Sequence, residues 1–259
     1  MLNKYVAFTI LVFALYACTE ESVKEQKVVK DIKLSAEQII DSVYQTHGVS
    51  KLNDMNVSFD FRDYSYGFTH KEMGVERTRT IQDSTGRIIE DIWSGKSLVR
   101  SIDAENIEVD SVKQGLYKNS INSVFYFAFL PKGLKDPAVN TDLLEETTVW
   151  DENYYKIKVT FDEEGGGEDH EDVFIYWVHK KNFTMDYLAY EYFTEGGGIR
   201  FRAAVNPRKI KGVRFQDYHN FKPSDTITEL TKIDQAYDLG NVELVSKIEL
   251  KNIELSKRK

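Results

Sequence analysis

The sequence predicts a mainly β protein of the α+β class, in which a large antiparallel sheet is covered by a few helices. Three observations predict it. One amphipathic helix stands near the N-terminus, alternating strands with turn signals fill most of the remaining chain, and two strands are apolar on both faces. Strands that follow one another without intervening helices favour antiparallel pairing over βαβ units.

The helix is predicted by its caps and its period. Ser35 to Gln38 has the pattern of a capping box, and Gly48 is placed to end the helix. Between them, residues on one helical face recur at the spacing of three and four that buries a stripe. These residues are Ala36, Ile39, Ile40, Val43, Tyr44 and His47.

The strands are predicted by alternation between turn signals. Residues 56–62 alternate through Val57, Phe59 and Phe61, and residues 242–250 are predicted as the last strand. A further strand, at 155–161, has an apolar face opposite a polar face that carries Lys156 and Lys158.

Residues 173–179 and 187–193 carry apolar or aromatic side chains on both faces of their strands. A sheet with two apolar faces must be covered twice, or covered once with the other face lining a cavity. The run 124–130, stopped by Pro131, is apolar all round and could be a covering helix or a buried strand.

Composition excludes several classes of protein. The 259 residues are 41% hydrophobic and include 15 Tyr, 15 Phe and 3 Trp, which is ample material for a core. A mean hydropathy of −0.45 with one long apolar run excludes a multi-pass membrane protein. A net charge of −8 without a clustered basic segment argues against nucleic acid as a partner.

The N-terminus has the features of a secretion signal. Lys4 precedes an apolar run, 5–17, which is too short to span a bilayer, and Ala17 directly precedes Cys18, the single cysteine. Residues 15–18 resemble the lipobox of bacterial lipoproteins, in which the equivalent of Cys18 is lipidated after cleavage. The alternatives are an ordinary secretory signal with a chance cysteine, or a cysteine of the core.

This resemblance implies a signal peptide at 1–17 and a lipidated Cys18, which begins a charged tether at 18–34. The remaining residues, 35–259, show no internal boundary and are predicted to form a single domain. The protein would then be anchored by lipid in the cell envelope, at the outer membrane, on its periplasmic face or the cell surface. Residues 19–21 also resemble the acidic tag of surface-exported lipoproteins of Bacteroidota, although a solvated linker explains them equally.

The whole arrangement resembles the LolA/LolB-like lipoprotein carriers, and residues 35–223 resemble more closely a family of Bacteroidota lipoproteins with a domain of unknown function. The carriers' fold implies a curved half-barrel sheet that holds acyl chains in a hydrophobic cavity under helices. The closer resemblance has no activity attached to it. It depends on residues 123–127, 130–137, 166–174, 185–190, 196–202 and 206–208.

Aromatic side chains are the candidates to line such a cavity. They are Phe125, Tyr126, Phe129, Tyr176, Tyr187 and Tyr190. A dry core is the alternative, because aromatic stripes usually pack into one.

Two pairs of arginines, Arg77 with Arg79 and Arg200 with Arg202, stand two residues apart, so each pair shares a strand face. Facing inward, such a pair could hold a carboxylate or a phosphate. A face turned to water is the more common arrangement for charged side chains, and it is the one expected here.

The densest polar cluster, residues 168–172, offers Asp169, His170 and Asp172 as metal ligands, with Glu171 between them. The spacing does not fit a calcium loop, because Val173 stands at the twelfth position counted from Asp162. A solvated turn after three glycines is the alternative. No cofactor is expected, and no motif of a catalytic nucleophile occurs.

The sequence therefore favours a non-catalytic, lipid-anchored envelope protein that binds a lipid or another hydrophobic ligand. The alternatives are a metal-dependent enzyme centred on residues 169–172, and a surface module that binds a partner without a ligand.

Overall fold

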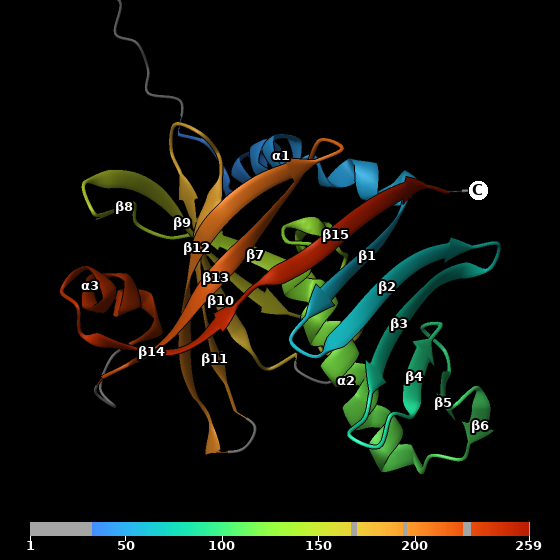
Figure 1. Cartoon of the computed structure of the whole chain (residues 1–259). Coiled ribbons are helices and arrows are strands. Elements are labelled where there is room, and N and C mark those ends of the chain that lie inside the picture. Colours follow the sequence, from blue (N-terminus) through green and yellow to red (C-terminus); the bar gives the residue numbers. More distant parts are fainter. Residues whose placement is uncertain (1–32, 167–169, 194–195, 225–228, 259) are drawn as a thin grey trace, which may run out of the picture. The chain divides into compact units, whose positions relative to one another are not determined.

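The computed structural model describes residues 33–166, 170–193, 196–224 and 229–258. Leu34–Lys259 form one compact unit (Figure 1). The described part of this unit contains both sheets and both hydrophobic cores set out below, so it has what a chain needs to fold independently of residues 1–33. Among the described residues no helix has the length and apolar character needed to cross a membrane.

The predicted N-terminal helix is confirmed as α1 (Ala36–His47). Ser35 accepts a hydrogen bond from the Gln38 backbone N–H, and the Gln38 side chain accepts one from the Ser35 N–H. Gly48 ends the helix at φ 67°, a left-handed conformation that glycine adopts without strain. A short 3₁₀ segment, η1 (Val49–Asp54), leads from there into the first strand.

The first sheet has the strand order β15-β1-β2-β3-β4-β5-β6, and every neighbouring pair is antiparallel. The predicted strand at 56–62 is β1. The strands are β1 (Met55–Phe61), β2 (Tyr64–Lys71), β3 (Gly74–Gln82), β4 (Ile88–Trp93), β5 (Leu98–Ile102), β6 (Glu105–Ile107) and β15 (Leu250–Lys257).

The second sheet has the order β14-β13-β12-β11-β10-β9-β7, and β8 (Thr147–Val149) pairs with β9. It contains both strands that were predicted to be apolar on two faces. The strands are β7 (Val139–Leu143), β9 (Glu152–Phe161), β10 (Val173–His179), β11 (Met185–Tyr192), β12 (Gly198–Ile210), β13 (Val213–Pro223) and β14 (Val242–Ile248). The predicted fold class is therefore confirmed: the sheets are antiparallel, curved and not closed into a barrel.

The chain crosses from the second sheet back to the first sheet where β14 ends and β15 begins. A single last strand was predicted at 242–250, but β14 ends at Ile248 and the chain crosses to the first sheet at Leu250. The buried Asp217 carboxylate holds this crossing, because it accepts hydrogen bonds from the Leu250 N–H and from Arg208, each at 2.9 Å. Alternation continues through the crossing, so the sequence pattern alone does not reveal it.

Helix α2 (Ser111–Ala128) contacts both sheets. The apolar run 124–130, which the sequence left open between helix and strand, forms the last turn of this helix and the residues after it. Phe125 packs against Phe59 of β1 at 5.6 Å between ring centroids, and Tyr126 packs against Phe174 of β10 at the same distance. A short 3₁₀ turn, η2 (Lys132–Lys135), follows α2.

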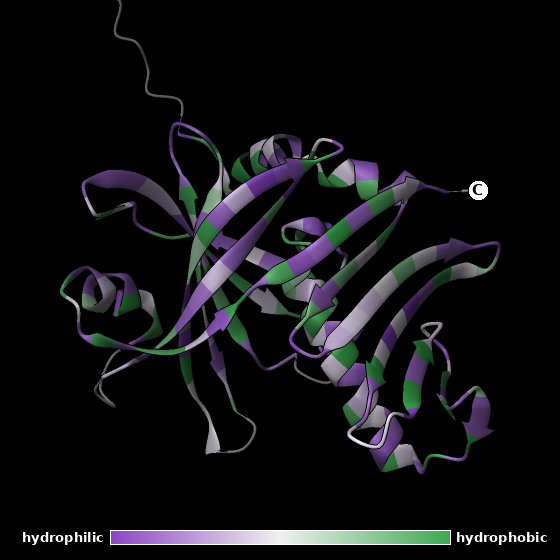
Figure 2. Ribbon diagram, in the orientation of Figure 1, coloured by the Kyte–Doolittle hydropathy of each residue, from purple (hydrophilic) through white to green (hydrophobic). Residues whose placement is uncertain are grey.

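The two apolar faces of the second sheet carry two separate cores, so the prediction of two apolar faces is confirmed. On one face Ile157, Tyr176 and Leu188 join α1, α2 and the first sheet. On the other face Trp177 and Phe201 pack beneath η4 (Leu230–Lys232) and α3 (Ile233–Asp238). Figure 2 shows the underlying alternation of hydrophobic and hydrophilic residues along the strands.

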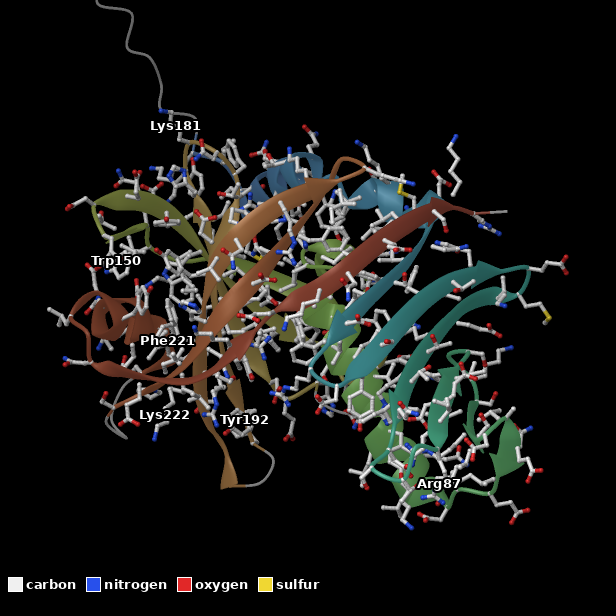
Figure 3. All side chains as sticks on the ribbon, viewed as in Figure 1. Arg87, Trp150, Lys181, Tyr192, Phe221 and Lys222 are labelled. Atoms are coloured by element: carbon white, nitrogen blue, oxygen red, sulfur yellow. The ribbon has the colours of Figure 1, made fainter. Side chains whose placement is uncertain are left out.

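The face beneath α3 corrects one expectation. Lys156 was expected on a polar face, but it is buried, with its Nζ 2.9 Å from the Asp234 carboxylate of α3 and 5.4 Å from the ring centroid of Trp177. Tyr237 of α3 stacks on Trp150 at 5.1 Å and packs against Phe221 at 5.4 Å (Figure 3). The polar side of the β9 pattern is thus used to attach a helix.

Candidate functional site

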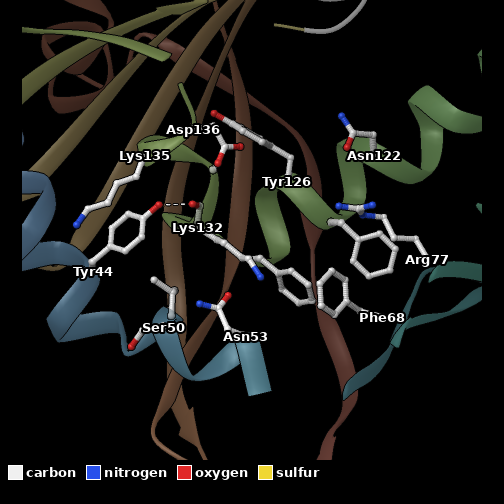
Figure 4. A pocket seen from close by; sticks show the side chains of 14 residues that line it. Tyr44, Ser50, Asn53, Phe68, Arg77, Asn122, Tyr126, Lys132, Lys135 and Asp136 are labelled. Atoms are coloured by element: carbon white, nitrogen blue, oxygen red, sulfur yellow. Dashed lines mark hydrogen bonds between the residues drawn. The ribbon is translucent and has the colours of Figure 1, made fainter. Parts of the chain in front are cut away.

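A pocket of about 480 Å³ lies beside the C-terminal half of α2 and opens to solvent (Figure 4). Its walls come from α1, η1, β2, β3, α2 and η2, which the chain brings together from the whole first half of the compact unit. The lining residues are Tyr44, Val49, Ser50, Asn53, Phe68, Arg77, Asn122, Phe125, Tyr126, Phe129, Lys132, Gly133, Lys135 and Asp136.

The floor of this pocket is aromatic. Phe125 and Phe129 stand four residues apart on the end of α2, so both project from the same face of the helix. Phe68 of β2 packs against both, at 5.1 Å from Phe129 and 6.0 Å from Phe125 between ring centroids. All three residues are buried, so the rings pack mainly against one another and contribute only the edge of this cluster to the pocket lining.

Two cationic side chains stand above this floor. The Arg77 guanidinium lies 5.6 Å from the centroid of Phe68 and 4.9 Å from that of Trp93, and the Lys132 ammonium lies 5.0 Å from the centroid of Phe68. Burial lowers the pKa of both groups, and the charge of Arg77 lowers the pKa of Lys132 further. Within the described part of the chain, neither cation has a carboxylate within ion-pair distance.

Hydrogen bonds fix the remaining walls. The Tyr44 hydroxyl donates to the Lys132 carbonyl oxygen, and burial raises the pKa of Tyr44 to about 12. The Tyr126 hydroxyl lies 2.7 Å from that of Tyr176, and burial raises the pKa of both. Asp136 is the carboxylate among the lining residues, and burial raises its pKa although Lys132 opposes this.

A second hollow lies on the other flank of α2, as a pocket of about 340 Å³ and a smaller one of about 190 Å³. Both are lined by Phe127, Tyr190 and Arg202. Arg202 donates a hydrogen bond to the Tyr190 hydroxyl at 3.1 Å and lies 5.2 Å from the centroid of Phe127. Its Nε atom is buried and has no hydrogen-bond partner within the described segments of the chain.

The structure divides the predicted ligand-binding residues among three environments. Phe125, Tyr126 and Phe129 line the pocket of about 480 Å³ beside α2, here called the larger pocket, while Tyr190 and Arg202 line the hollow on the other flank of α2. Others lie outside these pockets. Tyr176 is fully buried, Arg200 lies over Tyr192 at 5.1 Å, and Tyr187 lies on the opposite face of the sheet against Phe201 and Tyr237.

The position of Tyr187 has a simple cause. It stands three residues before Tyr190 on β11, and an odd separation on a strand places two side chains on opposite faces. The aromatic count along the strand could not distinguish these faces, but strand parity could have done so.

The expectation that Arg77 and Arg79 face water is wrong. Arg79 is 6% exposed and donates to the Asp91 carboxylate at 2.6 Å, and Arg100 donates to the same carboxylate at 2.7 Å. Although burial raises the pKa of Asp91, hydrogen bonds from Arg100 and Arg79 outweigh it and lower that pKa. Arg77 reaches the larger pocket. Sequence reasoning therefore missed the combination of Phe68, Arg77 and Lys132.

The predicted metal ligands and lipid anchor are only partly within the described residues. His170 and Asp172 are described, and Asp172 lines the smaller pocket, but Asp169 and Cys18 lie outside the described residues. Among the described residues, no group of three or more His, Cys, Asp or Glu side chains could hold a metal ion.

These features define an α+β protein of unclosed antiparallel sheets with pockets on both flanks of a helix. Residues 4–250 match the family described as "Family of unknown function (DUF6503)", and the chain belongs to this family. No curated protein sequence is similar to the chain.

Solved structures with a similar arrangement include a LolA superfamily protein from Nitrosomonas europaea, with 14% identity, a TM-score of 0.46, and coverage of 88% of this chain and 94% of that one. A DUF1329 family protein from Desulfovibrio piger has 10% identity, a TM-score of 0.34, and coverage of 83% and 92%. The lipoprotein LppX from Mycobacterium tuberculosis has 9% identity, a TM-score of 0.28, and coverage of 63% and 91%.

Proposed function

We propose that this protein is a lipid-anchored lipoprotein of the cell envelope that binds a hydrophobic ligand in the pocket beside α2. The observation that carries the proposal is the aromatic floor of that pocket, formed by Phe68, Phe125 and Phe129. A volume of about 480 Å³ falls within the range of roughly 300–1,000 Å³ that ligand sites occupy.

The binding surface is formed before any ligand arrives. Ile121 and Phe125 of α2 are almost completely buried, and Phe125 packs against rings from two strands of the first sheet. A ligand therefore meets an ordered wall and does not have to order the helix, which lowers the entropic cost of binding.

The anchoring part of the proposal is supported by the sequence. The lipobox-like residues 15–18 place the single cysteine where lipidation occurs in bacterial lipoproteins. The charged residues 19–33 would then form a tether between the membrane and the compact unit.

Native mass spectrometry of residues 19–259, followed by organic extraction and lipid analysis, tests the ligand. We expect a co-purifying or added lipid to appear as a discrete mass shift. Ser50 lines the pocket on its exposed rim, so Ser50→Trp should block entry and reduce binding at least tenfold without entering the core.

The matched control is Ser97→Trp, which adds the same side chain at an exposed turn outside the pocket. Equal lipid binding by both variants, or no lipid bound by the unmodified protein, would count against the pocket.

A further inference from the structure

We infer that the pocket beside α2 selects amphiphiles that carry an anionic head group, a carboxylate or a phosphate, which Arg77 and Lys132 hold while the apolar chain lies on the aromatic floor. The inference rests on the proposed function and goes beyond it, because it names the chemistry by which a ligand is chosen.

The two cations converge although 55 positions separate them in the sequence. Arg77 comes from β3 and Lys132 from η2, and both charged groups lie over the same ring, Phe68, at 5.6 and 5.0 Å. Figure 4 shows both side chains reaching toward the rings at the floor. The charge of Arg77 lowers the pKa of Lys132, so the two cations repel each other, and an anion near both would offset that repulsion.

Neither cation is neutralised by the described residues. The neighbouring Arg79 and Arg100 share the buried Asp91 carboxylate. Among the residues that the structure describes, Arg77 has no such partner, and its buried Nε has no hydrogen-bond acceptor. A buried donor without an acceptor is costly, and this chain has 42 acidic residues from which an acceptor could have been supplied. Because the Nε is itself buried, the terminal N–H groups of the Arg77 guanidinium are the donors to which a ligand oxygen in the pocket would bind.

The charged residues that line the pocket have a positive net charge. Lys135 forms an ion pair with Asp41, so it contributes little. Asp136 is the carboxylate among the lining residues and interacts electrostatically with Lys132, and the two positive charges of Arg77 and Lys132 against this one negative charge leave a net charge of +1 among the lining residues. This stands in a protein whose formal net charge is −8. A single anionic head group would therefore neutralise the net charge of the residues that line the pocket.

The chemistry of the ligand follows from having both features in one pocket. An inorganic anion would pair with the cations but leave the aromatic floor uncovered. A neutral hydrophobic molecule would cover the floor but leave the charges of Arg77 and Lys132 without a counter-ion. A single-chain anionic amphiphile satisfies both, because the planar guanidinium of Arg77, which lies near the Phe68 and Trp93 rings, is suited to bind a carboxylate or a phosphate with two N–H groups.

The test compares three probes on delipidated residues 19–259 by calorimetry or by displacement of a fluorescent fatty acid. The probes are sodium oleate below its micelle concentration, oleyl alcohol, and inorganic phosphate. Oleate and oleyl alcohol share one chain and differ in the charge of the head group. We expect oleate to bind at least tenfold more tightly than oleyl alcohol, and phosphate to bind only weakly.

Variants then assign the preference to the two side chains. Arg77→Gln and Lys132→Gln should each weaken oleate binding about tenfold and leave oleyl alcohol within about twofold, while Lys132→Arg should keep the preference. Arg87→Gln removes an exposed cation at the turn between β3 and β4 (Figure 3) and should change neither affinity. Thermal unfolding of each variant shows that it is folded.

The possible outcomes distinguish the selectivity for an anionic head group from the proposed binding of a hydrophobic ligand. If oleate and oleyl alcohol bind equally and the cation variants change nothing, the selectivity is overturned while the proposed function stands. If neither chain-bearing probe binds, the proposed function fails. Phosphate binding as tight as oleate binding would show a site for free anions and would overturn the amphiphile assignment.

Discussion

Arg77 and Arg79 stand two residues apart on one face of β3, but they serve the two flanks of α2. Arg77 lines the larger pocket, and Arg79 lines the hollow on the other side, where Asp91 neutralises it. The spacing correctly indicated a shared face, but the presence of one carboxylate, from β4, decided which arginine is satisfied and which is available. At the scale of single residues, the available ion-pair partner decides the role of an arginine, and its spacing in the sequence decides only which strand face it shares.

His47 gives a residue-scale prediction about pH. It is 1% exposed, and its Nε2 accepts a hydrogen bond from the Met185 N–H at 3.2 Å, which requires the unprotonated ring nitrogen. Burial, and then the charge of Arg214, lower its pKa to about 3. Below its ordinary value of 6.5 the unfolded chain takes up a proton that the folded chain refuses, so stability falls as the pH falls from 6.5 towards 3.

We expect the free energy of unfolding to be about 2 kcal/mol lower at pH 4.5 than at pH 7 because of this histidine. Urea unfolding at both pH values measures the difference. His47→Gln keeps an acceptor for the Met185 N–H but does not titrate, so its stability should change less over this interval. An identical loss in both proteins would show that other groups carry the dependence.

At the scale of elements, the sequence predicted α1, β1 and the two strands with two apolar faces, because each has a strong local pattern. It did not place the end of β14, because Ile248 and Leu250 continue one alternation across two strands in different sheets. It also left 124–130 undecided, because a run that is apolar all round has no period from which helix or strand can be read. Contacts with both sheets then select the helix.

The C-terminal strand β15 gives an element-scale prediction. It pairs with β1 from Met55–Lys257 to Phe61–Leu250, and Leu250 and Leu255 are buried in the main core. A chain that ends at Glu249 loses this ladder and both leucines, each worth about 2–5 kcal/mol, and leaves β1 as an open edge. We expect it to aggregate and to show no cooperative thermal unfolding.

The control is a chain that ends at Lys257, which keeps all of β15. It should unfold cooperatively within a few degrees of the complete chain. Cooperative unfolding of the shorter chain would mean that the second sheet and its helices fold without β15.

At the scale of the whole molecule, the pocket proposed to bind a ligand is formed where helices α1 and α2 and the first sheet meet around the turn η2. Phe68, Phe125 and Lys132 come from β2, α2 and η2, and each alone is an ordinary core or surface residue. Of the aromatic residues predicted to line a cavity, Phe125 and Tyr126 lie on α2 and Phe129 directly follows it, in the run that the sequence left open between helix and strand. Helix α2 packs into the main core, and pockets lie on both of its flanks.

The proposed lipid anchor gives a prediction for the whole molecule. Cys18 is the single cysteine of the chain, so labelling with an alkyne fatty acid reports on it alone. We expect the protein to be labelled and to sediment with membranes. Cys18→Ser removes the residue that would carry the lipid, so this variant should not be labelled and should remain in the supernatant, because the acyl chains supply the membrane affinity. Label retained by the variant would contradict the lipobox interpretation.

Local patterns in the sequence determined the fold class, the capped helix, the strands and the two apolar faces, since these depend on residues three, four or two positions apart. The tertiary structure decided which face each aromatic ring occupies, that Lys156 attaches α3, and that Arg77 and Lys132 meet over Phe68. Burial and charge compensation depend on neighbours distant in sequence, so the binding chemistry of the pocket emerges only when the chain is folded.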